Sequence, residues 1–156
     1  MAKKSIDKSI SISNRKARFE YELLEVFTAG IQLQGTEIKS LRTGNANLAE
    51  AYCYVQQSEV WITCMYIAEY QYGSYMNHEP KRLRKLLLNK KEINKISSAL
   101  QNVGITLVPL KLYISDKGWA KIEIALAKGK KLHDKREDLK QKDDKRQMDR
   151  ALKKFK

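Results

Sequence analysis

The stretch GITLVPLKLYISDKGWAKIEIALAKGKK, residues 104–131, decides the fold. Apolar and polar residues alternate from Leu110 to Ser115, and they alternate again from Ala120 to Leu126. Asp116-Lys117-Gly118 lies between these two runs, and a glycine-bearing turn flanked by period-two alternation predicts a β-hairpin. No strand-like apolar run follows, because the chain continues with Lys128-Gly129-Lys130-Lys131. The hairpin therefore ends the folded body, and a basic tail begins there.

A helix precedes this hairpin. Asn89 followed by Glu92 is a capping-box pattern, which marks a helix start. Four apolar residues then recur at helical spacing: Ile93, Ile96, Leu100 and Val103. Gly104 suits the position just past a helix end. The pattern predicts a helix over residues 90–103 with one apolar face turned to the core.

Further upstream the chain is rich in strand-forming residues. Runs 51–55 and 60–67 flank a four-residue polar break and predict a second hairpin. Residues 19–27 and 36–42 predict two further strands, with a turn of helix or a bend at 31–35. The second hairpin carries four aromatic residues: Tyr52, Tyr54, Trp61 and Tyr66. They either stack on exposed bases or pack within the sheet, and packing is favoured because no basic residues are interleaved with them.

Strands paired by hairpins, with one helix before the last pair, predict a mainly β fold with helices. The specific expectation is a small OB-like antiparallel β-barrel with flanking helices. The pattern alone does not separate that barrel from an open α+β sheet. The predicted organisation is a mobile N-terminal arm at 1–13, an OB-like barrel at 14–131 and a basic tail at 132–156.

The tail contains neither glycine nor proline, and its apolar residues are sparse. Met148, Leu152 and Phe155 form only a thin stripe at one end. Such a helix is marginal in water without a broad apolar face. We expect the tail to be disordered when free and helical when it lies in a charged groove. The alternative is a tail that only improves solubility.

Charge is concentrated at the two ends of the chain. Thirty-one Lys and Arg against 18 Asp and Glu give a net charge of +13. Residues 1–18 carry +5 and residues 128–156 carry +7, which leaves the intervening body at +1. A nearly neutral body with two basic ends predicts a polyanionic partner, with nucleic acid favoured over a purely solubilising role.

Motifs for other functions are missing from the sequence. Cys53 and Cys64 do not make a disulfide framework in a chain of this size. His78 and His133 have no cysteine or histidine partners at metal-ligand spacing, so no metal and no cofactor are expected. We find no phosphate loop or nucleophile motif, and we expect no enzyme activity. No apolar segment is long enough for a membrane span, so a cytoplasmic location is expected.

Four basic clusters are candidates for phosphate contacts: residues 14–18, Lys39 with Arg42, residues 81–85, and residues 128–131. They form one phosphate-tracking surface if the barrel brings them to one side. Glu37 is the most notable carboxylate. It is interpreted first as an ion-pair partner, and second as an acceptor for base edges or 2′-hydroxyls in an RNA interface.

Several of these segments resemble motifs of the bacterial SsrA-binding protein family, also called small protein B. They occur in order as NRKA (14–17), AGIQLQGTEIKSLR (29–42), RKLLL (84–88), VPL (108–110), AKGKK (127–131) and DKR (134–136). The resemblance implies an RNA-binding protein of trans-translation with an OB-like barrel. Such a protein binds the tRNA-like domain of transfer-messenger RNA and delivers it to stalled ribosomes. Its tail becomes helical in the decoding centre and the empty message channel of the small subunit.

The resemblance also implies site residues. Those matching RNA-binding motifs are Asn14, Arg15, Lys16, Glu37, Lys39, Arg42, Lys85, Leu87, Lys128, Gly129, Lys130 and Lys131. Those matching tail motifs that contact the ribosome are Asp134, Lys135, Arg136, Ala151, Leu152 and Lys153. The family often has glutamate at the position of Thr28, so a carboxylate role there is not expected. A monomer when free is expected, and a ribosome-associated structural protein that binds ribosomal RNA is the alternative function.

Overall fold

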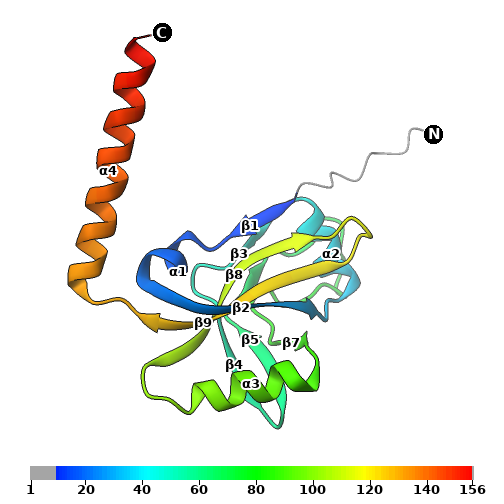
Figure 1. The fold of residues 1–156 in the computed structure, drawn as a ribbon. Helices are drawn as coiled ribbons and strands as arrows, with labels where there is room; N and C mark the ends of the chain where they lie inside the picture. The colour runs from blue at the N-terminus through cyan, green and yellow to red at the C-terminus, as the bar shows by residue number, and fades with distance from the viewer. Residues whose placement is uncertain (1–9, 156) are drawn as a thin grey trace.

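The computed structural model describes residues 10–155 as a β-barrel body from which one long helix projects (Figure 1). The strands are β1 (Ser11–Ser13), β2 (Tyr21–Ile31), β3 (Ala46–Asn47), β4 (Tyr52–Gln56), β5 (Glu59–Thr63), β6 (Tyr66–Ile67), β7 (Arg84–Leu87), β8 (Ile105–Ile114) and β9 (Ala120–Gly129). The helices are α1 (Arg15–Glu20), α2 (Gly35–Arg42), α3 (Lys90–Leu100) and α4 (Leu132–Lys154).

Six strands close a ring, so the predicted antiparallel barrel is confirmed. The neighbours around the ring are β8, β4, β5, β7, β2 and β9, and β9 pairs again with β8. Every one of these pairings is antiparallel. β1 adds to the outside edge of β8, and β3 with β6 forms a separate two-stranded sheet. Ring closure removes the unpaired edges that an open sheet would present.

Both predicted hairpins are present. β8 and β9 pair from Ile105↔Lys128 to Ile114↔Ala120, and Gly118 in their turn has φ +87°, a conformation that glycine adopts without strain. β4 and β5 turn tightly through Gln57 and Ser58, which both have positive φ. That pattern is the type I′ turn, whose twist matches the twist of the two strands.

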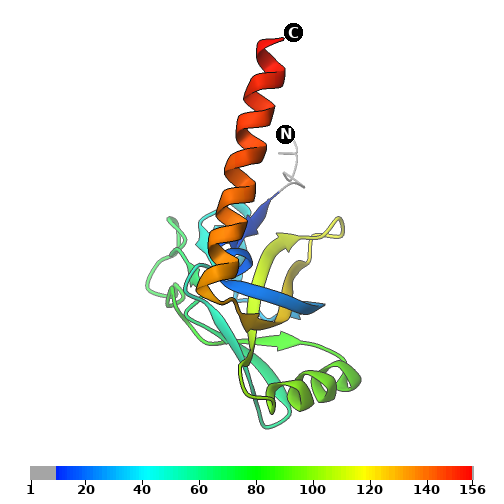
Figure 2. The same ribbon diagram turned by 60° about the vertical axis from the view of Figure 1, so that its left-hand side comes forward.

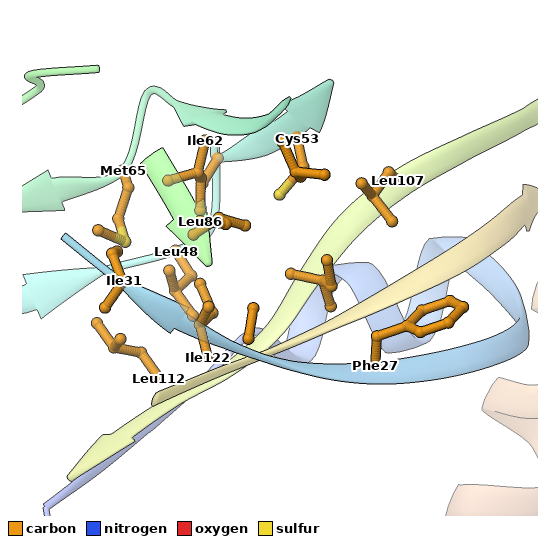
Figure 3. Close-up of a cluster of buried hydrophobic side chains, with 14 of the residues drawn as sticks. Phe27, Ile31, Leu48, Cys53, Ile62, Met65, Leu86, Leu107, Leu112 and Ile122 are labelled. Atoms are coloured by element: carbon orange, nitrogen blue, oxygen red, sulfur yellow. The ribbon is translucent and has the colours of Figure 1, made fainter. Parts of the chain in front are cut away.

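One apolar core fills the barrel (Figure 3). The alternating residues of the last hairpin supply its centre: Leu107, Leu112, Ile114, Ile122, Ile124 and Leu126 all face inward. Ile96 of α3 is fully buried and closes one end of the core. The helix starts as predicted, because Asn89 and Glu92 form the reciprocal capping box. It ends three residues earlier than expected, and Val103 is fully exposed.

Two of the four aromatic residues of the second hairpin are half-buried and two are exposed. Tyr54 and Trp61 are register partners and are half-buried, as packing predicts. Tyr52 and Tyr66 are exposed, because each alternates with a buried neighbour on its strand. The packing interpretation is therefore right for one pair and wrong for the other.

Residues 36–42 form helix α2, so the predicted strand is wrong. The capping box that starts α2 joins Gln34 and Glu37, and Glu37 accepts a hydrogen bond from the Gln34 backbone at 2.7 Å. Ile38 and Leu41 lie three residues apart, which places both on the inner face of the helix. An apolar pair three residues apart is a helical signal. The charged residues beside Ile38 and Leu41 made the segment look like the alternating pattern of a strand. A helical turn or bend was expected at residues 31–35; Ile31 ends β2, Gly35 begins α2, and residues 32–34 between them are not helical.

The N-terminal segments also differ from expectation. Ser11–Ser13 pairs with Tyr113–Lys111 of β8, so the predicted mobile arm does not extend to residue 13; residues 1–9 lie outside the described part of the chain. Helix α1 occupies Arg15–Glu20, and the first long strand begins at Tyr21 rather than at residue 19. The backbone of β8 provides hydrogen-bonding partners that stabilise β1.

The tail is a helix of 23 residues in this structure, where disorder of the free chain was expected. Its composition explains the helix, because it has no glycine or proline and many strong helix formers. Figures 1 and 2 show that α4 extends away from the barrel over most of its length. The helix touches the body near its start, through α1.

Candidate nucleic-acid interface

An open hollow of about 790 Å³ lies where β2 ends and β9 begins. Its lining residues are Gly30, Ile31, Gln32, Leu33, Gln34, Arg82, Leu87, Trp119, Ala120 and Lys121. Trp119 follows the β8–β9 turn and is 70% exposed, and Leu87 is 47% exposed. The residues around the hollow thus include the indole ring of Trp119, the amides of Gln32 and Gln34, and the cations Arg82 and Lys121. A ligand can approach them from solvent.

Strand pairing builds the floor of this hollow. Gly30 is the register partner of Leu87 on β7 and of Lys121 on β9. A Cβ at Gly30 would lie 3.3 Å from the Leu87 Cβ, so the glycine lets the two strands pack closely at this point. The backbone N–H of Gln32 donates to the Lys85 backbone oxygen at 3.0 Å, which extends the pairing of β2 with β7 by one residue. The floor is therefore made of paired backbone, while Gln32, Leu87 and Trp119 above it are exposed.

A buried ion cluster supports one wall of the hollow. Glu37 is fully buried on α2, and its Oε1 accepts from Arg84 Nε at 2.8 Å. Arg82 donates to both carboxylate oxygens, at 3.0 Å from Nε and 2.9 Å from Nη2. Arg84 is also fully buried and donates to the Met65 backbone oxygen at 2.7 Å. The cluster fixes α2 against the segment that leads into β7.

This cluster decides the role of Glu37. Burial raises the pKa of its carboxyl, but hydrogen bonds from Arg82 and the Gln34 backbone and the charge of Arg84 outweigh burial and lower the pKa. Both oxygens of this carboxylate are occupied within the protein. The ion-pair interpretation is confirmed, and direct RNA contact by Glu37 stays a prediction. Arg84 likewise leaves the predicted basic surface, because its guanidinium lies in the core.

Asn14 also has a structural role. Its side-chain oxygen accepts from the Ala17 backbone at 3.1 Å and caps α1. Its amide nitrogen donates to the backbone oxygens of Leu48 at 3.1 Å and Pro109 at 3.0 Å. Because Asn14 is buried and its polar atoms have partners, it positions α1, and its RNA contact stays a prediction.

Two of the predicted basic clusters meet at the junction of β9 and α4. β9 pairs with β2 through Tyr21↔Gly129, so the chain entering β2 from α1 lies beside the chain leaving β9. The Lys130 backbone N–H donates to Glu20 at 2.9 Å. We call this place the junction cluster; its exposed cations are Arg15, Lys16, Arg18, Lys128 and Lys131.

Lys130 has a partner inside the protein, and its predicted RNA contact stays a prediction. Its ammonium is half-buried and forms an ion pair with Asp138 on the second turn of α4. That charge is used inside the protein and helps to set the direction of the helix. Gly129 is exposed, and a Cβ there would meet nothing within 4 Å, so the fold does not require glycine at this position. Its predicted close approach to a phosphate remains a prediction.

The hollow and the junction cluster occupy opposite ends of β2 and β9. β2 runs 11 residues from Tyr21 to Ile31, and β9 returns beside it. At about 3.3 Å per residue, the two ends are roughly 30 Å apart along the strands. The basic clusters therefore do not form one compact surface; Figure 1 shows α4 at one end of this strand pair and α2 toward the other.

The remaining predicted residues divide between these surfaces and the tail. Lys39 and Arg42 are exposed on α2, and Lys85 forms a 2.7 Å ion pair with Glu59 on β5. Leu87 lines the hollow. The predicted tail residues Asp134, Arg136, Ala151, Leu152 and Lys153 are exposed on α4, and Lys135 is half-buried.

Sequence reasoning missed Gln32, Gln34, Trp119 and Lys121 as residues of the hollow. Arg82 was noted only as a member of a basic cluster. The signal was present at Trp119, because a large aromatic residue directly after a turn glycine has no core position to fill. Gln32 and Gln34 flank Leu33, and that alternation at the end of a strand places both amides on the outer side.

Within residues 10–155, no three histidine, cysteine or acidic side chains gather closely enough to hold a metal ion. No helix in the same part of the chain has the length and apolar character needed to cross a bilayer.

A closed barrel with an open hollow that combines aromatic, amide and cationic groups defines a nucleic-acid-binding protein. The basic junction cluster and the cationic helix beside it fit the same class. The particular family follows from comparison with known proteins. Residues 11–154 match the family model of SmpB protein, and the chain belongs to that family.

Relatives are similar over nearly their whole length. An SsrA-binding protein of Phocaeicola vulgatus is 58% identical over 144 residues, which is 92% of this chain and 96% of the relative. An SsrA-binding protein of a Nostoc species is 50% identical over 156 residues, 99% of this chain and all of the relative. A chain in the solved structure "tmRNA-SmpB: a journey to the center of the bacterial ribosome" is 44% identical with a TM-score of 0.68, covering 80% of this chain and 87% of that one.

Proposed function

We propose that this chain is an RNA-binding protein of trans-translation that binds the tRNA-like domain of transfer-messenger RNA and brings it to stalled ribosomes. The observation that carries the proposal is the hollow, which exposes a stacking surface and hydrogen-bonding amides above a floor of paired backbone. Family membership and relatives called SsrA-binding proteins supply the identity of the RNA. A cytoplasmic location is part of the proposal.

In this proposal the hollow recognises a folded RNA by shape. The Trp119 ring stacks on a base or a ribose at the edge of the RNA, and stacking tolerates any base. Gln32 and Gln34 donate and accept hydrogen bonds with base edges or 2′-hydroxyls. Lys121 and the exposed side of Arg82 contact phosphates, which position the RNA without reading sequence. Glu37 acts indirectly, because it holds Arg82 in place.

The junction cluster and α4 have a different task in this proposal. Exposed cations at the junction contact RNA phosphates, and Lys130 directs α4 away from the barrel. The helix then enters the decoding centre and the empty message channel, where its cations meet ribosomal RNA. An unoccupied channel admits the helix and a channel filled by message does not, so α4 distinguishes stalled ribosomes from translating ones.

The decisive experiment separates binding from delivery. Trp119→Ala with Lys121→Glu should weaken binding of a tRNA-like transcript at least tenfold, because one stacked group and one phosphate contact are lost. Deletion of residues 132–156 should leave that affinity nearly unchanged and abolish peptide tagging on stalled ribosomes. Asp116→Asn with Lys117→Gln, at the same turn but outside the hollow lining, is the matched control.

Three results contradict the proposal. The double variant could bind the transcript like the wild type while remaining folded. The truncated chain could still support tagging, or it could lose RNA binding together with tagging. RNA that co-purifies with the chain tests the alternative of a ribosomal structural protein, since ribosomal RNA fragments would favour that role over one discrete tRNA-like species.

A further inference from the structure

The loop from Tyr70 to His78, reading YQYGSYMNH, exposes more apolar surface than its length explains. We call it the tyrosine loop. Tyr72 is 80% exposed, Tyr75 is 95% exposed and Met76 is 74% exposed. Both tyrosine rings lie outside the core, so packing inside the barrel does not account for them. The loop contains no acidic residue.

The tyrosine loop is braced by its own polar side chains. Asn77 accepts from the Tyr70 backbone N–H at 3.1 Å and donates to the Tyr70 backbone oxygen at 2.9 Å, which ties the two ends of the loop together. A Cβ at Gly73 would lie 2.6 Å from the Asn77 amide nitrogen, so only glycine admits this close approach. The loop therefore presents its rings from a fixed backbone, which lowers the entropy lost when a ligand binds.

A second brace anchors the loop to the barrel. His78 is buried, and its Nε2 donates to the Ile67 backbone oxygen at 3.0 Å. Its Nδ1 then accepts from the Thr36 hydroxyl of α2 at 2.9 Å. The loop is thus connected to β6 on one side and to α2 on the other.

Cations accompany the exposed rings. Lys39 of α2 places its ammonium 5.4 Å from the centroid of the Tyr70 ring, and Tyr70 contacts Tyr72 edge to face with centroids 5.7 Å apart. Arg42 lies three residues beyond Lys39, so it faces the same side of the helix. The nearest acids in sequence are Glu69, which precedes the loop, and Glu79, which follows it.

We propose that the tyrosine loop is a second RNA-binding surface that takes unpaired bases by stacking them on Tyr72 and Tyr75. Lys39 and Arg42 contact the phosphates beside those bases. Aromatic platforms with adjacent cations bind single strands without sequence preference, because every base has a π-face. The acid-free loop and its cationic neighbours favour a polyanion over a protein partner. The inference rests on the proposed RNA-binding function and adds a surface to it.

The surface is separate from the hollow. In Figure 2 the loop before β7 projects on the left of the barrel, whereas the β8–β9 turn that carries Trp119 lies on the right. Helix α2 contacts both places, through Glu37 to Arg82 and through Lys39 to Tyr70. One RNA with an unpaired segment, or two different RNAs, can therefore occupy the two surfaces together.

The test uses the full chain and two probes: a six-nucleotide single-stranded oligoribonucleotide and a twelve-base-pair RNA duplex. Tyr72→Ala with Tyr75→Ala should weaken oligonucleotide binding at least about fivefold, because each stacked base contributes that much or more. Duplex binding should change less than twofold. Tyr72→Phe with Tyr75→Phe is the matched variant and should retain wild-type affinity, since phenylalanine keeps the stacking face.

Ring proton resonances of the two tyrosines give a direct readout, and they should shift upfield when the oligonucleotide is added. Wild-type affinity of the alanine variant would overturn the inference, and so would an equal loss for the phenylalanine variant, which would indicate hydroxyl contacts. Affinity for the tRNA-like transcript is measured on the same proteins. If the hollow variant loses the transcript while the alanine variant keeps the oligonucleotide, only the tyrosine loop inference fails; if the hollow variant keeps the transcript, the proposed function fails.

Discussion

Charged residues have different roles in the barrel body and in helix α4. In the body, Glu37 of α2 and Arg84 of β7 are both fully buried and form an ion pair with each other. In α4, charged side chains face solvent along almost the whole helix. A buried charge is satisfied by partners inside the protein, whereas an exposed charge remains available for a ligand. The comparison teaches that burial separates the charges that hold the fold from the charges that are available to a ligand.

Apolar residues show the same division. Leu112 and Ile122 are fully buried in the barrel, and their removal would leave a cavity. Met148, Leu152 and Phe155 of α4 are 64%, 68% and 92% exposed. An apolar stripe without a partner contributes little to the stability of the free protein. We expect it to be buried only when α4 lies in its channel.

The largest effect is expected at the buried ion cluster. Glu37→Gln leaves Arg84 buried without a counter-charge, and loss of one partner of a buried pair destabilises by about 3–5 kcal/mol. Chemical denaturation measures the free energy of unfolding. Glu59→Gln is the control, because its pair with Lys85 is partly exposed and contributes at most about 1 kcal/mol. Equal losses for the two variants would show that burial does not set the strength of these pairs.

Acid pH tests the same cluster in the wild type. The pKa of Glu37 is lower in the folded chain than its ordinary value of 4.5. The carboxylate therefore stabilises the fold fully above pH 4.5, and this stabilisation is lost as the pH falls through the lower, folded-state pKa. Unfolding free energy should decline more steeply below pH 4.5 in the wild type than in the Glu37→Gln variant. Parallel pH profiles would contradict the role assigned to this carboxylate.

A break in the middle of α4 should have the next largest effect, and that effect should stay local. Lys145→Pro removes a backbone hydrogen bond and costs about 3 kcal/mol of helix stability. Far-UV circular dichroism should report the loss of several helical turns. The melting temperature of the barrel should not change, because the described core contains no residue of α4. Lys145→Ala is the control. A lower barrel melting temperature for the proline variant alone would show that α4 contributes to the stability of the barrel.

The sequence predicted the barrel because two hairpins carry strong local signals. Alternation from Leu110 to Ile124 around Gly118 specifies both the strands and their register. The same reasoning failed at residues 36–42, since alternation of charged and apolar residues over one helical turn looks like a strand. Only the ion cluster with Arg82 and Arg84, more than forty residues away, shows why Glu37 faces inward. Local patterns do not encode a contact at that separation.

The site was predicted less completely than the fold. Exposed cations such as Arg15 and Lys128 could be named from their clusters and from the family resemblance. Asn14 and Glu37 were assigned to RNA contact, although the fold uses both for positioning. The hollow itself requires β2 to pair with both β7 and β9, and these strands are more than fifty residues from β2 in the sequence. Composition gives the partner class, whereas tertiary structure decides which residues reach it.

The smallest effect concerns the direction of α4 rather than its stability. Among the described side chains, two contacts tie the first half of the helix to the body: Asp138 pairs with Lys130, and the Lys142 ammonium lies 5.5 Å from the Phe19 ring centroid. A partly exposed ion pair and an exposed cation–π contact each contribute about 1 kcal/mol or less. Asp138→Asn with Lys142→Gln should therefore change the unfolding free energy by no more than about 2 kcal/mol.

The orientation of α4 relative to the body should nevertheless become more variable, because these contacts lie near the point where a long helix leaves the barrel. A displacement at the second turn is multiplied along a helix of 23 residues, which spans about 35 Å. Spin labels at Asn102→Cys and Arg150→Cys, in a Cys64→Ser background, report the distance between body and helix end. Its distribution should broaden in the double variant while helicity is kept. Asp143→Asn, which loses only a pair with Arg146 inside α4, is the control and should leave the distribution unchanged. An unchanged distribution in the double variant would show that the Gly129–Lys131 connection alone directs the helix.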